Sequence, residues 1–192
     1  MTTLGSPDRP TRNERGDGEP ELQSRLRAAA VRYLAAGWPI LPAREPTNEQ
    51  LVCNRGPADP RTAAQWWSDR PYGIACRTGV LFDVLQVPGW LGEQVLPGVE
   101  HHGGALIRQR SLEVVWQFLV TPGAPTIAEL PAGSGVRLIG ARRWIVLPPT
   151  PVLGGGTRWA TRPRLPGFRP PHSLTVQWAV VRAMTRAQRE RQ

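Results

Sequence analysis

The chain has 192 residues, 40% of them hydrophobic, which is enough for one domain with a packed core. Its formal net charge is +9, and all 24 lysine-or-arginine positions are arginine. The apolar runs are too short for a transmembrane helix, and two cysteines, Cys53 and Cys76, are too few for a disulfide framework or a zinc site. We therefore expect a cytoplasmic protein with no membrane partner.

The N-terminal third predicts a leader followed by helix, strand and helix. Residues 1–20 are polar and rich in glycine and proline, which is typical of a disordered segment. The next residues have apolar side chains at helical spacing up to Gly37, which is placed to end that helix. A short strand is expected over residues 38–43. A second helix should begin with Asp59 as its N-cap and Pro60 as its first residue.

The rest of the chain predicts strands, with a short helix around residues 90–96 and a last helix that Ser173 caps. The expected strands cover residues 72–78, 80–87, 103–109, 113–120, 135–140, 143–149 and 154–161. The third and fourth of these should pair with each other, and so should the fifth and sixth. The last helix is expected to pack on the domain through Trp178 and Val181, which lie on its apolar side.

This order of elements predicts an α+β fold with a mainly antiparallel sheet. We expect one folded domain over residues 21–163. A linker rich in proline and arginine and a basic C-terminal helix should follow over residues 164–192.

The positive charge is concentrated near the end of the sequence. Residues 158–192 contain eight arginines and one glutamate, a balance of +7. Such a segment is typical of a surface that binds the phosphates of DNA or RNA, although an arginine-biased coding sequence would also leave a plain solvated face of this kind. The candidate nucleic-acid contacts are Arg158, Arg182, Arg186 and Arg189.

Four segments resemble, in order and spacing, the bifunctional primase–polymerase N-terminal domain. They are AAVRYLAAGWPILPA, ADPRTAAQWWSDRP, YGIACRTGVLFDVLQV and GVRLIGARRWIVLPPTPVLGGGTRWA, and the resemblance covers about residues 24–162. The resemblance implies a primase-type fold, whose core is an antiparallel sheet like that of an RNA-recognition motif with helices behind it. It also implies primer synthesis and DNA extension with metal-bound nucleoside triphosphates.

The resemblance further implies a set of catalytic positions. Family members hold divalent cations with two acids at a spacing of two on one strand and a third acid on a later strand, and a histidine meets the triphosphate. Asp83 matches the first acid, but Leu85 stands at the second position. Gln117 occupies the histidine position, and Arg137 lies about where the third acid would be. We therefore expect a degenerate site without a metal, in which Asp83 pairs with an arginine.

The sequence leaves three hypotheses for the function open. The first is a catalytically degenerate primase–polymerase domain that binds nucleic acid or a nucleotide in a replication-related role. The second is an active primer-making polymerase with displaced acids, which would use Mg²⁺ or Mn²⁺ as cofactor. The third is a scaffold that keeps the fold and binds a protein partner.

Overall fold

The computed structural model describes residues 18–44, 51–130 and 133–190. The helices within them are α1 (Gly18–Ala35), α2 (Pro60–Asp69), α3 (Gly89–Val95) and α4 (Ser173–Arg189), with the short 3₁₀ helices η1 (Leu96–Gly98) and η2 (Glu100–His102). The strands are β1 (Ile40–Ala43), β2 (Gly73–Arg77), β3 (Asp83–Pro88), β4 (Ala105–Arg110), β5 (Glu113–Val120), β6 (Arg137–Ile139), β7 (Trp144–Val146), β8 (Pro151–Val152) and β9 (Gly155–Thr161). None of the helices in these ranges has the length and apolarity that a membrane span needs.

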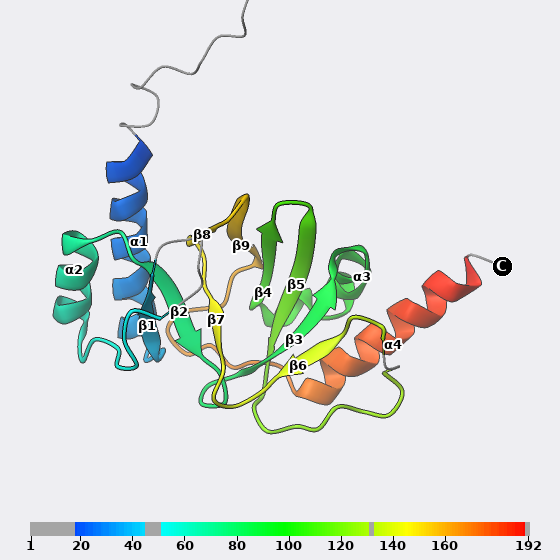
Figure 1. The fold of residues 1–192 in the computed structure, drawn as a ribbon. Coiled ribbons are helices and arrows are strands. Elements are labelled where there is room, and N and C mark those ends of the chain that lie inside the picture. The colour runs from blue at the N-terminus through cyan, green and yellow to red at the C-terminus, as the bar shows by residue number, and fades with distance from the viewer. Residues whose placement is uncertain (1–17, 45–50, 131–132, 191–192) are drawn as a thin grey trace, which may run out of the picture.

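The strands form two sheets whose pairings are antiparallel. The smaller sheet has the order β1-β2-β7, and the larger sheet has the order β6-β3-β5-β4-β9-β8 (Figure 1). In Figure 1, α1 and α2 lie on the side of the smaller sheet, and α3 and α4 lie on the side of the larger sheet. The predicted α+β class with mainly antiparallel sheets is therefore confirmed.

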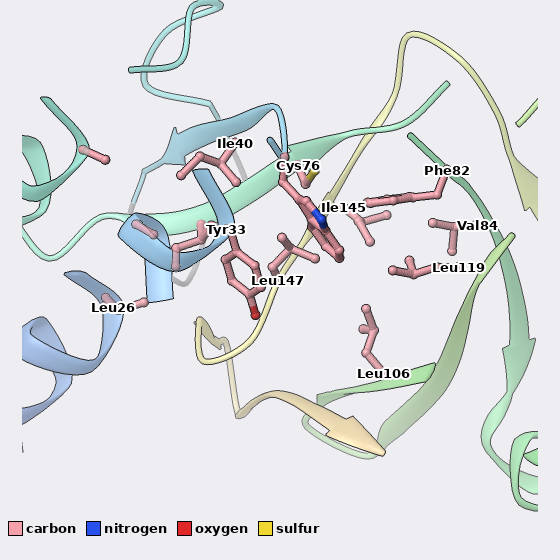
Figure 2. Close-up of a cluster of buried hydrophobic side chains, with 14 of the residues drawn as sticks. Leu26, Tyr33, Ile40, Cys76, Phe82, Val84, Leu106, Leu119, Ile145 and Leu147 are labelled. Atoms are coloured by element: carbon pink, nitrogen blue, oxygen red, sulfur yellow. The ribbon is translucent and has the colours of Figure 1, made fainter. Parts of the chain in front are cut away.

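The first hydrophobic core joins α1, α2 and the smaller sheet to one face of the larger sheet. Leu26 and Tyr33 come from α1, Ile145 comes from β7, and Val84 and Leu119 come from the larger sheet (Figure 2). Burying an aliphatic side chain of this size contributes about 1.5–3 kcal/mol. The buried face of the larger sheet is thus held against the rest of the molecule.

The second core lies on the opposite face of the same sheet, under α3 and α4. It contains Leu85 and Val87 of β3 together with Leu91 of α3 and Val180 of α4. Since side chains alternate along a strand, Val84 and Leu85 point to opposite faces. The larger sheet therefore has a helix-covered face and a face toward the smaller sheet.

The local signals for α1 and α2 agree with the structure, except at the start of α1. Asp59 accepts hydrogen bonds from the backbone amides of Arg61 and Thr62, as an N-cap does, and Gly37 has a φ of 80° after α1. Residues 1–17 of the predicted leader lie outside the described residues. Residues 18–20 were assigned to that leader wrongly, because they form the first turn of α1.

The predicted pairing between residues 135–140 and 143–149 is wrong. Instead, β6 pairs with β3, and β7 pairs with β2 of the smaller sheet. Each strand completes the open edge of an existing sheet, which satisfies backbone groups that a lone hairpin would leave exposed. The chain crosses between the two sheets over residues 140–143, where Arg142 has a positive φ of 63°.

The predicted orientation of the last helix is also wrong. Trp178 is 42% exposed, and the buried side chains include Val176, Ala179, Val180 and Ala183. These four follow the i, i+3, i+4, i+7 spacing of one helix face. Their small size lets α4 approach the sheet closely, whereas a tryptophan at the same depth would hold it away. The cap is His172, whose Nδ1 accepts from the amide of Leu174, and not Ser173.

Candidate functional site

A groove of about 610 Å³ opens on the face of the larger sheet that is turned toward the smaller sheet, away from α3 and α4. It is lined by parts of β4, β5, β6 and β7 and by the crossing segment 140–143. We call it the arginine groove, because four arginines line it, and no acidic side chain of the described residues does. These arginines are Arg108, Arg137, Arg142 and Arg143.

A row of polar side chains across three neighbouring strands runs from the floor of the arginine groove into the hollow beside it. Gln86 of β3 is the register partner of both Arg137 of β6 and Gln117 of β5. The amide nitrogen of Gln117 donates a hydrogen bond to the side-chain oxygen of Gln86 at 3.1 Å. Gln117 is 1% exposed, and its own side-chain oxygen has no hydrogen-bond partner among the described residues. The floor therefore holds one buried acceptor that is not satisfied.

A second hollow of about 330 Å³ adjoins the arginine groove and shares Arg108 and Arg137 with it. Gln86, Arg110 and Glu113 also line this hollow. Glu113 is the one acidic residue of the described chain that lines either space, and it lies at the exposed start of β5. The combined surface is thus strongly positive, with amides between the guanidinium groups.

Asp83 lies apart from this surface. It begins β3 and precedes Leu85 and Val87, which belong to the helix-side core, so its side chain takes the helix-covered face. One carboxylate oxygen accepts a hydrogen bond from the backbone amide of Gly123 at 2.8 Å. The other oxygen is buried without a hydrogen-bond partner among the described residues.

The arginine partner that we expected for Asp83 is therefore replaced by a backbone amide. The β3–β5 register pairs Asp83 with Val120, and Gly123 follows three residues later in the turn that leaves β5. A carboxylate at the first position of β3 can reach that turn, and the hydrogen bond ties the end of one strand to the start of the other.

The structure brings two of the sequence-predicted site residues together and separates the others from them. Gln117 and Arg137 both line the arginine groove. Arg158 is the register partner of Ile107, whose side chain belongs to the helix-side core, so Arg158 takes the helix-covered face. The remaining candidates are exposed on α4, which packs on that same face: Arg182, Arg186 and Arg189.

Sequence reasoning missed Gln86, Arg108, Arg142 and Arg143. Alternation along β3 was a usable signal for Gln86, because it places that side chain opposite Leu85 and Val87. Arg142 and Arg143 reach the groove only because β6 and β7 belong to different sheets, so that the segment between them spans the gap. No local pattern indicates that arrangement.

The side chains of the arginine groove do not fit a pair of divalent cations. Such ions prefer several carboxylate oxygens, whereas this groove offers amides and guanidinium groups, which repel a cation. In the described part of the chain, no three His, Cys, Asp or Glu side chains are grouped as a metal site would require.

Comparison with known proteins gives one family. Residues 30–176 match the bifunctional DNA primase/polymerase N-terminal domain. The match covers most of the described fold, including β5 and β6, which line the arginine groove, and β3, whose Gln86 lines the hollow beside it. No curated protein is significantly similar to the chain in sequence.

Proposed function

Because the chain belongs to the family of bifunctional DNA primase/polymerase N-terminal domains, we propose that it binds nucleic acid or a nucleotide in the arginine groove without transferring nucleotides. The observation that carries this proposal is the charge of the groove. Five arginines and two paired glutamines line the groove and the hollow beside it, where metal-dependent transfer would need several carboxylates. A replication-related role in the cytoplasm belongs to the same proposal. Its support is the family relationship and two cysteines that are both free thiols.

Guanidinium groups are well suited to phosphate. Each presents several N–H donors in a fixed fork, which matches two phosphate oxygens at once. Arg108 and Arg137 extend from strands, so the sheet fixes the positions of their backbones. Arg142 and Arg143 are exposed on the crossing segment at the rim. A phosphate in the groove would therefore meet donors from the floor and from the edge.

The amides of the floor suit the rest of a nucleotide. The Gln86 side chain is partly exposed, and its amide nitrogen can donate a hydrogen bond to a base or to a sugar hydroxyl. The phosphate contacts themselves carry no base information. We therefore expect binding that depends strongly on salt and only weakly on sequence.

Nucleotidyl transfer by the family's chemistry requires metal ions that bring the attacking and leaving oxygens together. In this chain the groove positions of β3, β5 and β6 are Gln86, Gln117 and Arg137, and none of them is a carboxylate. The carboxylate of Asp83 lies on the other face of the sheet, and one of its oxygens accepts a hydrogen bond from the backbone amide of Gly123. These positions favour a binding domain over a polymerase.

Arg158, Arg182, Arg186 and Arg189 remain a separate proposed contact to nucleic acid. They lie on the helix-covered face, so they do not belong to the arginine groove. They would add salt-dependent attraction to any long strand that passes around the molecule.

The decisive experiment measures binding of a labelled single-stranded oligonucleotide of mixed sequence by fluorescence anisotropy over a range of salt concentrations. A groove variant carries Arg137→Gln, Arg142→Gln and Arg143→Gln. A control variant carries Arg27→Gln, Arg61→Gln and Arg70→Gln, which removes the same charge from exposed sites on and beside α1 and α2. If three phosphate contacts are lost, the groove variant should lower the log–log salt slope by about two units. The control should keep the slope of the unchanged protein.

Three results would overturn the proposal. Equal losses in both variants would mean that net charge, and not the groove, drives the binding. No binding at low salt, where electrostatic attraction is strongest, would favour the scaffold hypothesis. A third variant with Arg182→Gln, Arg186→Gln and Arg189→Gln tests the α4 contact separately. Incorporation of labelled nucleotides on a primed or unprimed template with Mg²⁺ or Mn²⁺ would instead support the active-polymerase hypothesis.

A further inference from the structure

A third cavity, of about 280 Å³, lies beside α1 and shares no lining residue with the arginine groove. One wall is α1, and the opposite side is formed by the turn at Pro148 and Pro149, by Trp159 of β9 and by residues 162, 163 and 165. We call it the α1 pocket. Three arginines line it, namely Arg25, Arg32 and Arg162.

The sequence of α1 explains how two of these arginines frame the pocket. Arg25 and Arg32 are seven residues apart, so they lie on one helix face and about 10.5 Å apart along the axis. Ala28 and Ala29 lie between them and also line the pocket. Because their side chains are single methyl groups, the helix surface between the two arginines stays open. Arg162 completes the frame from beyond the end of β9.

The charges that line the α1 pocket have one sign. No acidic side chain of the described residues lines it. Tyr33 is the other titratable group there, and its hydroxyl donates to the backbone oxygen of Pro148 at 2.7 Å and accepts from Trp159 Nε1 at 2.9 Å. Burial raises the pKa of Tyr33 to about 12, so the phenol stays neutral at physiological pH. Three arginines therefore line one pocket whose lining contains no acidic side chain of the described residues, and a bound anion would relieve their repulsion.

The size and surface of the pocket indicate what kind of anion fits. Its volume corresponds to roughly nine waters, so a bare phosphate would leave most of it empty. Pro148, Pro149 and Leu165 supply an apolar surface, and Trp159 adds an aromatic ring. Aromatic and apolar side chains of this kind stack against the flat face of a base.

We propose that the α1 pocket is a second binding site, which takes one nucleotide unit with its phosphate on Arg25, Arg32 and Arg162 and its base against Trp159 and the prolines. The site goes beyond the proposed function, because it lies outside the arginine groove and does not depend on it. The nucleotide unit is either a free mononucleotide or one residue of a single strand. Both sources present the same phosphate and base.

The site is tested by isothermal titration calorimetry of the full chain with adenosine 5′-monophosphate, with adenosine and with inorganic phosphate. The pocket variant carries Arg25→Gln and Arg32→Gln, and its control carries Arg27→Gln and Arg61→Gln, which removes equal charge from exposed positions outside the pocket. We expect adenosine 5′-monophosphate to bind more tightly than phosphate or adenosine. The pocket variant should weaken that binding at least tenfold, and the control should leave it unchanged.

A second variant tests the apolar part of the pocket without changing its charge. Ala28→Leu fills the space between the two arginines on an exposed helix position that accepts leucine readily. It should abolish the advantage of adenosine 5′-monophosphate over phosphate. Unchanged nucleotide binding in both the Arg25→Gln/Arg32→Gln and Ala28→Leu variants would overturn the inference.

The groove variant separates this inference from the proposed function. If the groove variant loses binding of adenosine 5′-monophosphate and the pocket variant keeps it, the α1 pocket is refuted and the arginine groove stands. If nucleotide binding depends on Arg25 and Arg32 while the groove variant binds strands normally, the pocket stands and the groove proposal fails. An unlabelled single-stranded oligonucleotide that displaces the nucleotide identifies a strand as the source, and failure to displace it identifies the free nucleotide.

Discussion

Gln117 and Gln86 face each other across β5 and β3 and share a hydrogen bond of 3.1 Å on the floor of the arginine groove. The pair is neutral and polar where the family's chemistry would call for charged metal ligands. Arg137 stands next to Gln86 in the same row, so positive charge flanks the amides. The chemistry of the groove is therefore anion binding, and its floor is sensitive to added negative charge.

Gln86→Glu should weaken binding of a single-stranded oligonucleotide by about tenfold at low salt. The new carboxylate still accepts the hydrogen bond from Gln117, so the fold should be preserved, but it lies among Arg108, Arg110 and Arg137 and repels phosphate. Anisotropy titration measures the affinity. The matched control is Gln109→Glu, on an exposed residue of β4 that lines neither groove nor hollow. Equal losses in the two variants would contradict a specific role for the floor.

Asp83→Ala should destabilise the fold by about 1–3 kcal/mol without changing the affinity of the groove. The substitution leaves the amide of Gly123 without its acceptor in a partly buried site, and an unsatisfied donor of this kind costs about that much. Urea denaturation gives the free energy of unfolding. Asp69→Ala, at the exposed end of α2, is the control. A loss of oligonucleotide binding in folded Asp83→Ala protein would show that the carboxylate acts in the groove after all.

The parts of the fold that were predictable are those with local causes. Asp59 and Pro60 begin α2 because a side-chain cap and a fixed φ act within one turn, and Gly37 follows α1 because its positive φ suits glycine. The same holds for the turn at Arg110 and Ser111, which joins two strands that are neighbours in sequence and in space.

The parts that were not predictable depend on distant partners. The sequence does not say that β6 joins β3 while β7 joins β2, since both pairings connect segments that are far apart in the chain. It also favoured Trp178 as a core residue because Trp178 lies on the apolar side of the predicted helix, whereas the close approach of α4 requires its alanines and valines. The arginine groove depends on the first of these facts, so its four arginines could not be grouped from sequence alone.

The two cysteines should differ in reactivity toward a thiol reagent at neutral pH. Cys76 is fully buried, and burial raises the pKa of its thiol, so the reactive thiolate is suppressed. Cys53 is partly exposed and donates its thiol hydrogen to the backbone oxygen of Arg55 at 2.9 Å. One thiol per chain should therefore react in the folded protein and two in denaturant. Cys53→Ser should leave none in the folded protein, and rapid labelling of that variant would contradict the burial of Cys76.

Gly92→Ala should lower the free energy of unfolding by about 1–3 kcal/mol, even though alanine is the better helix former. A methyl group at Gly92 of α3 would overlap the ring of Trp116 on the helix-covered face of β5. The higher helix propensity of alanine would stabilise the fold by only about 1 kcal/mol, so the overlap with Trp116 makes the net effect destabilising.

Gly98→Ala is the matched control for Gly92→Ala, since a methyl group there would meet the Cβ of Ala179 at an ordinary 3.6 Å. A double variant with Trp116→Leu tests the cause. Leucine makes room for the added methyl group, so the cost of Gly92→Ala should nearly disappear in that background. Additive losses in the double variant, measured by urea denaturation, would mean that Trp116 is not the obstacle and that α3 packs on β5 in another way.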